Sequence, residues 1–247
     1  MAERIVVNNE SQVPALKRIG IIGGMGQWAT LDIVRRILKA AVNHPIPQYG
    51  NRGYPLMDIR MLNRAPMILN PDGSYPEILE PSPELLAAAR FVGENTDVII
   101  IGSNTAHIFS EQVEAESGKP VLSLIELAVN EAKRRGLRRV GILSIGLTVE
   151  KELFQEPLRA AGIESVVLPV DLMKRLDDEA IYPIQEGGNP EEYQKVGIEM
   201  IEALRSYNVE AIILGCSELP ILLGERAEES DIINPSELVA QKAVQML

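Results

Sequence analysis

The chain has 247 residues, of which 46% are hydrophobic, and a formal net charge of −11 at pH 7. This length and composition allow one large or two small cores, and the acidity argues against nucleic acid or an anionic membrane as partner. A single cysteine excludes an internal disulfide and suggests a reducing cytoplasm, and we expect neither a signal peptide in the first eighteen residues nor a membrane span.

The first half of the chain predicts strands alternating with helices. After a polar lead-in over 1–17, an apolar run ending in glycines predicts a strand at 18–24. A helix is expected to follow it, with a buried face of Leu31, Val34, Ile37, Leu38 and Ala41. Proline-rich residues 45–83 predict long loops with short extended pieces. The remaining predictions are a helix at 82–96 capped by Ser82, a strand at 97–102, a helix at 104–117, a strand at 119–124, and a helix that Gly136 stops.

The second half repeats this alternation. It predicts strands at 138–144, 163–170, 210–215 and 231–235, and helical segments at 148–162, 190–208, 217–227 and 236–247. Such alternation indicates an α/β fold with mainly parallel sheets flanked by helices.

Two landmarks suggest an internal duplication. Gly20 and Gly141 lie 121 positions apart in similar strands, and Gly102 and Gly215 lie 113 apart at similar strand ends. We therefore expect two pseudo-symmetric domains, an N-terminal one over 1–121 and a C-terminal one over 122–231. The C-terminal helix, 232–247, is expected to pack back on the first.

The ends of the predicted strands are the candidate site, because ligands bind beyond the carboxyl ends of parallel strands. Ser103 follows one strand and Cys216 the other, so these two residues are expected to flank a cleft between the domains. At the start of a helical turn the Cys216 thiol pKa is expected to be lowered, which favours thiolate. The alternative is a buried structural cysteine.

The neighbouring polar residues allow several roles. Ser103, Asn104 and Thr105 are candidate helix caps, and the last two are also candidate ligands for a carboxylate. His107 is expected to be structural rather than a base. The glycines near position 23 match a dinucleotide motif poorly, and the two histidines make no metal-binding pattern. Without further evidence Arg60 and Arg64 are solvated charges.

Three segments together resemble the aspartate/glutamate racemase superfamily, and most closely its aspartate racemase branch. They are "IGIIGGMGQWAT", "SNTAH" and "LGCSELP", where the family usually has GGMGPxAT, CNTAH and GCTE. The resemblance covers about residues 18–240. It implies an isomerase that interconverts L- and D-aspartate, or possibly glutamate, without PLP or metal. Members are often dimers, so a homodimer is expected.

The resemblance also implies roles for individual residues. Two cysteines of the family face opposite sides of the substrate Cα, where one removes the α-proton and the other returns a proton. Cys216 matches the second cysteine and Ser103 stands at the first. The matching implies substrate-binding residues at Met25, Arg64, Asn104, Thr105, Thr148 and Ser217, with Arg64 on the side-chain carboxylate.

The departures from the family pattern leave alternatives open. A serine hydroxyl holds its proton far more tightly than a thiol, so Ser103 implies an engineered or impaired racemase. A natural variant with weak or one-sided activity is another explanation. A one-cysteine relative is also possible, a decarboxylase or cis-trans isomerase of a dicarboxylic acid, as is a non-catalytic protein that binds acidic amino acids. Near residues 184–193 no lysine replaces the one that some members use on the distal carboxylate.

Overall fold

The computed structural model describes residues 17–42 and 53–247; most of the polar lead-in and His44 lie outside these ranges. The first half contains β1 (Arg18–Gly23), α1 (Gln27–Ala41), β2 (Leu56–Met61), α2 (Pro83–Gly93), β3 (Val98–Ile101), η2 (Thr105–Phe109), α3 (Ser110–Ser117) and α4 (Leu124–Arg134). The second half contains β4 (Arg139–Leu143), α5 (Gly146–Glu150), α6 (Gln155–Ala160), β5 (Glu164–Val167), α7 (Val170–Leu176), η3 (Asp177–Ile181), α8 (Tyr182–Gln185), α9 (Pro190–Arg205), β6 (Ala211–Leu214), α10 (Leu219–Leu223), η4 (Gly224–Glu228), β7 (Ile232–Ile233) and α11 (Pro235–Gln245).

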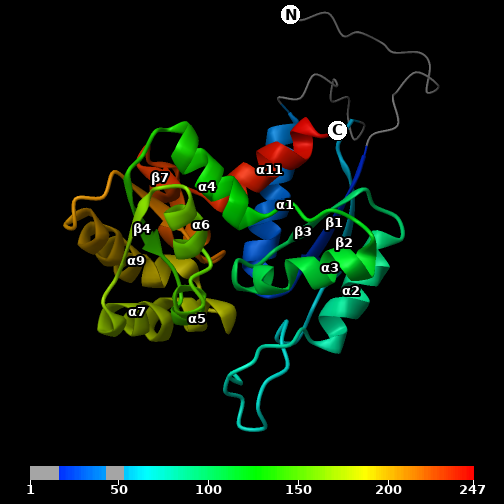
Figure 1. Cartoon of the computed structure of the whole chain (residues 1–247), viewed down its shortest axis with the longest axis horizontal. Coiled ribbons are helices and arrows are strands. Elements are labelled where there is room, and N and C mark those ends of the chain that lie inside the picture. The colour runs from blue at the N-terminus through cyan, green and yellow to red at the C-terminus, as the bar shows by residue number, and fades with distance from the viewer. Residues whose placement is uncertain (1–16, 43–52) are drawn as a thin grey trace, which may run out of the picture.

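The strands form two parallel sheets, one in each half of the chain, with helices around them (Figure 1). The first sheet has the order β2-β1-β3 and the second β5-β4-β6-β7. All the ladders are parallel. The predicted α/β fold of two mainly parallel sheets flanked by helices is confirmed.

The two sheets repeat one another in detail. β1 is the central strand of the first sheet and β4 is an inner strand of the second, and Gly20 and Gly141 lie within them. Gly102 N–H donates to Ile22 O at 2.8 Å at the end of β3, and Gly215 N–H donates to Leu143 O at 2.7 Å at the end of β6. Ser103 and Cys216 each come directly after these hydrogen bonds, so the two residues hold equivalent positions.

Helix α11 packs on the first sheet although it ends the chain. Its apolar residues share a buried cluster with Ile19 and Ile21 of β1 and with Ile33 and Ile37 of α1, and Figure 1 shows α11 beside α1. Residues 232 and 233 form β7 of the second sheet, within the strand predicted at 231–235, so the returning helix begins at Pro235 and not at residue 232. Helix α4 contributes to the cores of both halves.

The predicted buried face of α1 is partly wrong. Leu31 and Leu38 are exposed, while Asp32 and Arg36 are buried. The reason is an ion-pair network: Arg36 Nε lies 2.7 Å from Asp32 Oδ2, and its Nη1 lies 2.8 Å from a carboxylate oxygen of Glu228 and 2.7 Å from one of Glu237. This network joins α1 to η4 and α11. It orients α1 so that the charged side chains of Asp32 and Arg36 are buried and those of Leu31 and Leu38 are exposed.

Other segments differ from the sequence prediction in smaller ways. The predicted strand at 119–124 is reduced to one bridge between Ile99 and Val121. The predicted helix at 148–162 is split into α5 and α6, and helices α7, η3 and α8 were not predicted at all. Ser82 does cap α2, since its Oγ accepts a hydrogen bond from Leu85 N–H. In the described parts of the chain, no helix is both long and apolar enough to cross a membrane.

Candidate active site

The loop after β3 is fixed by a buried histidine. His107 Nδ1 donates to Ser103 O at 2.8 Å, and its Nε2 accepts from Leu124 N–H at 3.1 Å at the start of α4. Burial lowers the pKa of His107 to about 4, so the ring is neutral at pH 7. Because both nitrogens bond the backbone, the predicted structural role of His107 is confirmed, and the ring gives the Ser103 hydroxyl no base.

The halves meet at a pair of threonine hydroxyls. Thr105 Oγ1 lies 2.7 Å from Thr148 Oγ1, which joins η2 in the first half to α5 in the second. Thr148 is fully buried and Asn104, next to Thr105, is nearly so. Asn104 Oδ1 is buried without a hydrogen-bond partner. The structure therefore brings together three of the residues predicted to bind substrate.

The loop after β6 places a carboxylate against the only thiol. Cys216 is 5% exposed, and its Sγ–H donates to Glu218 Oε2 at 3.0 Å. Ser217 Oγ donates to the same oxygen at 3.2 Å, and Gln185 Nε2 donates to Glu218 Oε1 at 3.2 Å. Burial raises the pKa of Glu218. Thiol, hydroxyl and amide thus converge on one buried carboxylate.

The expectation of a lowered thiol pKa is wrong. Burial, followed by the negative charge of Glu218, raises the pKa of Cys216 well above its ordinary value. The helix that starts beside it, α10, has only five residues, and its positive end does not outweigh these two effects. Cys216 rests as a thiol that is already hydrogen-bonded to an acceptor for its proton.

A second contact between the halves lies at Gly26, the N-cap of α1. A Cβ at this position would lie 1.9 Å from Glu218 Oε1, and the backbone φ of +116° also favours glycine. On the other side of the same loop, Gly24 N–H donates to Thr30 Oγ1 at 3.0 Å. A Cβ on Gly102, the neighbour of Ser103, would lie 3.5 Å from that Thr30 oxygen. The glycine loop after β1 therefore lies against Glu218 at Gly26 and near the Ser103 loop at Gly102.

Met25 and Arg64 differ in where the structure places them. Met25 is partly buried and packs against the core of the first half, between the glycines of this loop. The Arg64 side chain is 72% exposed and forms a 3.8 Å ion pair with Glu84 of α2. Arg60 lies over the ring of Phe91 at 5.4 Å. Within the described residues, neither arginine forms a hydrogen bond or ion pair with the Cys216 loop.

The sequence did not single out three polar residues of this site: Asp177, Gln185 and Glu218. Glu218 belongs to the quoted "GCSE" segment, so its position beside Cys216 was a usable signal. Asp177 begins η3, and its Oδ2 accepts from Gly146 N–H at 3.2 Å while Oδ1 is buried without a partner. Burial raises its pKa to about 6. It carries no motif, so only the fold reveals it.

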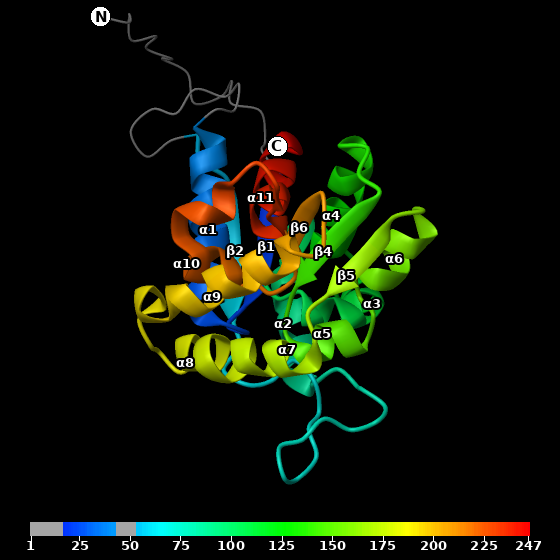
Figure 2. The same ribbon diagram turned by 90° about the vertical axis from the view of Figure 1, so that its left-hand side faces the viewer.

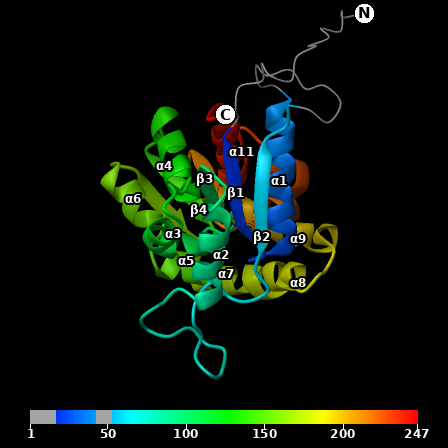
Figure 3. The ribbon, with the colours of Figure 1, turned by 90° about the vertical axis from the view of Figure 1, so that its right-hand side faces the viewer.

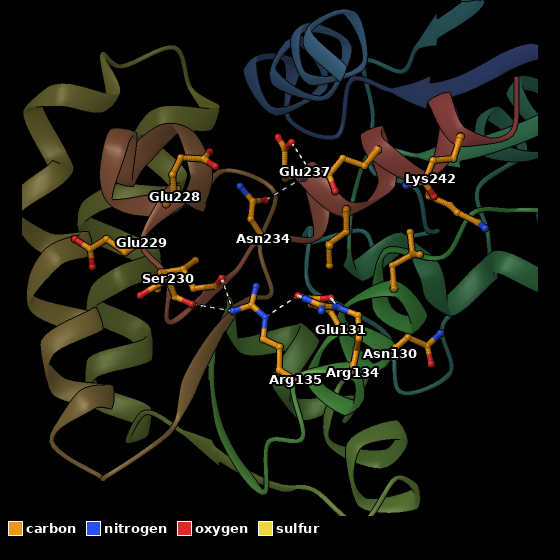
Figure 4. A pocket seen from close by; sticks show the side chains of 16 residues that line it. Asn130, Glu131, Arg134, Arg135, Glu228, Glu229, Ser230, Asn234, Glu237 and Lys242 are labelled. Atoms are coloured by element: carbon orange, nitrogen blue, oxygen red, sulfur yellow. Dashed lines mark hydrogen bonds and ion pairs between the residues drawn. The ribbon is translucent and has the colours of Figure 1, made fainter. Parts of the chain in front are cut away.

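A cavity of about 600 Å³ lies elsewhere, between α4, α11 and the segment after η4 (Figure 4). Neither Ser103 nor Cys216 lines it. Its charged side chains largely satisfy one another: Glu131 pairs with Arg134 at 2.7 Å and with Arg135 at 2.6 Å. Within the described residues, no group of three or more His, Cys, Asp or Glu side chains is arranged to hold a metal ion. Most of the candidate catalytic and binding side chains lie instead in the loops that follow β3 and β6.

Known proteins share this sequence pattern and fold. The family model for Asp/Glu/hydantoin racemases matches residues 22–243. The broad-specificity amino-acid racemase RacX of Bacillus subtilis is 23% identical over 229 residues, which cover 92% of this chain and 96% of that protein. The aspartate racemase of Picrophilus torridus superposes with a TM-score of 0.72 at 22% identity, over 93% of each chain. The maleate isomerase of Pseudomonas putida has a TM-score of 0.55 at 14% identity, over 94% of this chain and 92% of its own. The chain belongs to the Asp/Glu/hydantoin racemase family.

Proposed function

We propose that the chain is an amino-acid racemase scaffold that works by cofactor-independent proton transfer at Cα, with Cys216 and Glu218 as its working acid–base pair. The observation that carries this proposal is the 3.0 Å hydrogen bond from Cys216 Sγ to Glu218 Oε2 at the end of β6. A buried thiol beside a buried carboxylate can release its proton without solvent. The family and its racemase members support the same reaction class.

The proton steps follow from this pair. Glu218 accepts the thiol proton, and the resulting Cys216 thiolate removes the α-proton of the substrate to leave a planar carbanion. The raised pKa of both groups favours sharing one proton over a permanent thiolate. In the reverse direction the thiol returns its proton to Cα, and Glu218 restores the thiol. The pair therefore serves one face of the substrate in both directions.

Ser103 is the proposed occupant of the opposite face, and it limits the reaction. Its hydroxyl makes no hydrogen bond within the described residues, and His107 is held on the Ser103 carbonyl. An unassisted hydroxyl cannot remove an α-proton as a thiolate does. We therefore expect exchange of the α-proton that faces Cys216 but little inversion, which corresponds to an impaired racemase.

The substrate is expected to lie between the two loops. Asn104, Thr105, Thr148 and Ser217 are proposed to hold the α-carboxylate, with Met25 beside them. The sequence resemblance favours aspartate, or less strongly glutamate, with Arg64 on the second carboxylate. Because Arg64 is exposed and paired with Glu84, this contact requires the arginine to move. The homodimer and the cytoplasmic location remain predictions.

A one-cysteine decarboxylase or cis-trans isomerase is the second candidate. The single thiol and the fold shared with a maleate isomerase favour it. The intact "SNTAH" segment after β3 disfavours it, because this segment resembles the CNTAH motif of the racemases. Release of CO2 from a substituted malonate, or conversion of maleate to fumarate, would support this second candidate.

The test restores the missing thiol. The unmodified chain, Ser103→Cys, and Ser103→Cys with Cys216→Ser are incubated with single enantiomers of a panel of amino acids, and inversion is measured by chiral chromatography. Ser103→Cys should racemise at least one amino acid, and the added Cys216→Ser should abolish this activity. If Ser103→Cys inverts no member of the panel, the racemase proposal fails.

A further inference from the structure

Asp177 is a buried carboxylate that the proton-transfer chemistry does not use. The residue is 8% exposed, one of its oxygens accepts only the 3.2 Å hydrogen bond from Gly146 N–H, and the other has no partner. It begins a π-helical turn, a rare geometry that often occurs at functional sites. A buried acceptor without a donor calls for a partner, which can be water, an ion or a ligand, and Asp177 differs from the other such atoms of the described residues in carrying a carboxylate.

No cation of the described residues balances this charge. The lysines and arginines there form no ion pair with Asp177, Asp178 or Glu218, and Arg175, one turn away, pairs with Glu179 and Glu199. The charged group that acts on Asp177 is another carboxylate, Asp178. A substrate with a second carboxylate would therefore meet repulsion here, whereas a positive group would meet an unpaired counter-ion.

Two half-exposed tyrosines lie within reach of the Asp177 charge. Tyr75 in the loop between β2 and α2 is 49% exposed, and Tyr182 at the start of α8 is 43% exposed. Burial, and after it the charge of Asp177, raises the pKa of both hydroxyls. Figure 2 shows the 62–82 loop at the same end of the molecule as α5, α7 and α8. The charge of the buried Asp177 thus reaches one half-exposed tyrosine from each half of the chain.

In the proposed racemase Cα lies at the Cys216 thiol, so the substrate side chain is the part that can meet Asp177 and the two tyrosines. The aromatic rings would add favourable contacts for a cation beside them. Asp177 also acts electrostatically on Cys216, so the two groups belong to one site.

We propose that Asp177, together with Tyr75 and Tyr182, binds the side chain of the substrate. It selects amino acids with an ammonium or guanidinium side chain over aspartate and glutamate. The inference rests on the proposed racemase, and it replaces the acidic substrates that the sequence resemblance favours, with Arg64 on their second carboxylate, by a cationic class. It makes Asp177 a specificity-determining residue whose carboxylate pairs with the distal cation.

The test compares substrates that differ by one group. Rates of α-deuteration in D2O are measured by NMR for L- and D-lysine, norleucine, aspartate and glutamate, with the unmodified chain and with Ser103→Cys. Norleucine is the matched control, because it keeps the apolar stem of lysine without the ammonium. Lysine should exceed norleucine in kcat/KM by roughly 10- to 100-fold, the value of a hydrogen bond to a charged group, and aspartate should be slowest.

Two variants then assign the effect. Asp177→Asn should bring the kcat/KM for lysine to within a few fold of that for norleucine measured with the same variant. Asp178→Asn removes the same charge from an exposed neighbour and should keep the preference for lysine. If Asp177→Asn does not fold, the kcat/KM values for lysine, norleucine and aspartate in the unmodified and Ser103→Cys chains still test the proposal. Faster exchange of aspartate than of lysine, or an unchanged ratio in Asp177→Asn, overturns this subsite alone, whereas no exchange of any amino acid overturns the racemase as well.

Discussion

The buried His107 makes a quantitative prediction about stability in acid. Its ring bonds Ser103 O and Leu124 N–H, and burial lowers its pKa from 6.5 to about 4. A group whose pKa is depressed in the folded state binds its proton more readily when the chain unfolds. Its contribution to stability is therefore complete above pH 6.5 and is lost as the pH falls toward 4.

The magnitude follows from the linkage relation. At pH 5 an unfolded histidine is almost fully protonated, while His107 in the folded chain is mostly neutral. With these two pKa values, the free energy of unfolding should fall by about 2 kcal/mol between pH 7 and pH 5 from this residue alone. The raised pKa of the Asp177 carboxyl works in the opposite direction over the same range, so the total pH dependence does not isolate His107.

A difference measurement isolates it. Urea unfolding at pH 7, 6 and 5 is compared for the unmodified chain and His107→Gln, which offers an amide donor and acceptor but does not titrate. Contributions of Asp177, Glu218 and other groups cancel in the difference. The stability advantage of the unmodified chain should shrink by about 2 kcal/mol from pH 7 to pH 5. An advantage that stays constant, or a His107 ring that titrates near pH 6.5 by NMR, would refute the reasoning.

Three further substitutions test contacts between the halves. Gly26→Ala should reduce α-proton exchange at least ~10-fold, because the new Cβ displaces Glu218 and misplaced catalytic groups lose rate steeply; Gly73→Ala, also at positive φ but in open space, should retain exchange. Thr148→Val should cost about 1 kcal/mol of stability and raise KM, whereas Thr148→Ser keeps the hydroxyl pair and both values. Arg36→Met should lower the unfolding free energy by about 3 kcal/mol, since it leaves buried Asp32 with only the exposed Arg35 and removes the cation that Glu228 and Glu237 share. Arg35→Met keeps the buried Asp32–Arg36 pair, so its melting temperature should change little.

The sequence predicted the repeated parts of the fold well, for a physical reason. Buried parallel strands are short apolar runs ending in glycine, and both halves contain them, so Ser103 and Cys216 stood out as equivalent strand ends. Figure 3 shows the first of these sheets, with β2 and β1 beside α1. Local apolar patterns and glycine positions were sufficient for this level of description.

Side-chain partnerships between distant segments were not predictable in the same way. The buried face of α1 depends on ion pairs from Arg36 to residues about 200 positions away. The thiol pKa of Cys216 depends on burial and on the direction in which Glu218 points. Asp177 lies in a segment rich in acidic residues, where the apolar spacing is too weak to predict a helix. In each case the deciding interaction is between residues that only the fold brings together.

The most direct test of the Cys216–Glu218 account is the ratio of α-deuteration to inversion in the unmodified chain. Each enantiomer of the best substrate is incubated in D2O; NMR gives the deuterium content at Cα, and chiral chromatography gives the inverted fraction. The account predicts that one enantiomer gains deuterium much faster than it inverts, and that Glu218→Gln slows this exchange. Deuteration and inversion at equal rates in the unmodified chain would contradict it, because Ser103 would then be working as a second base.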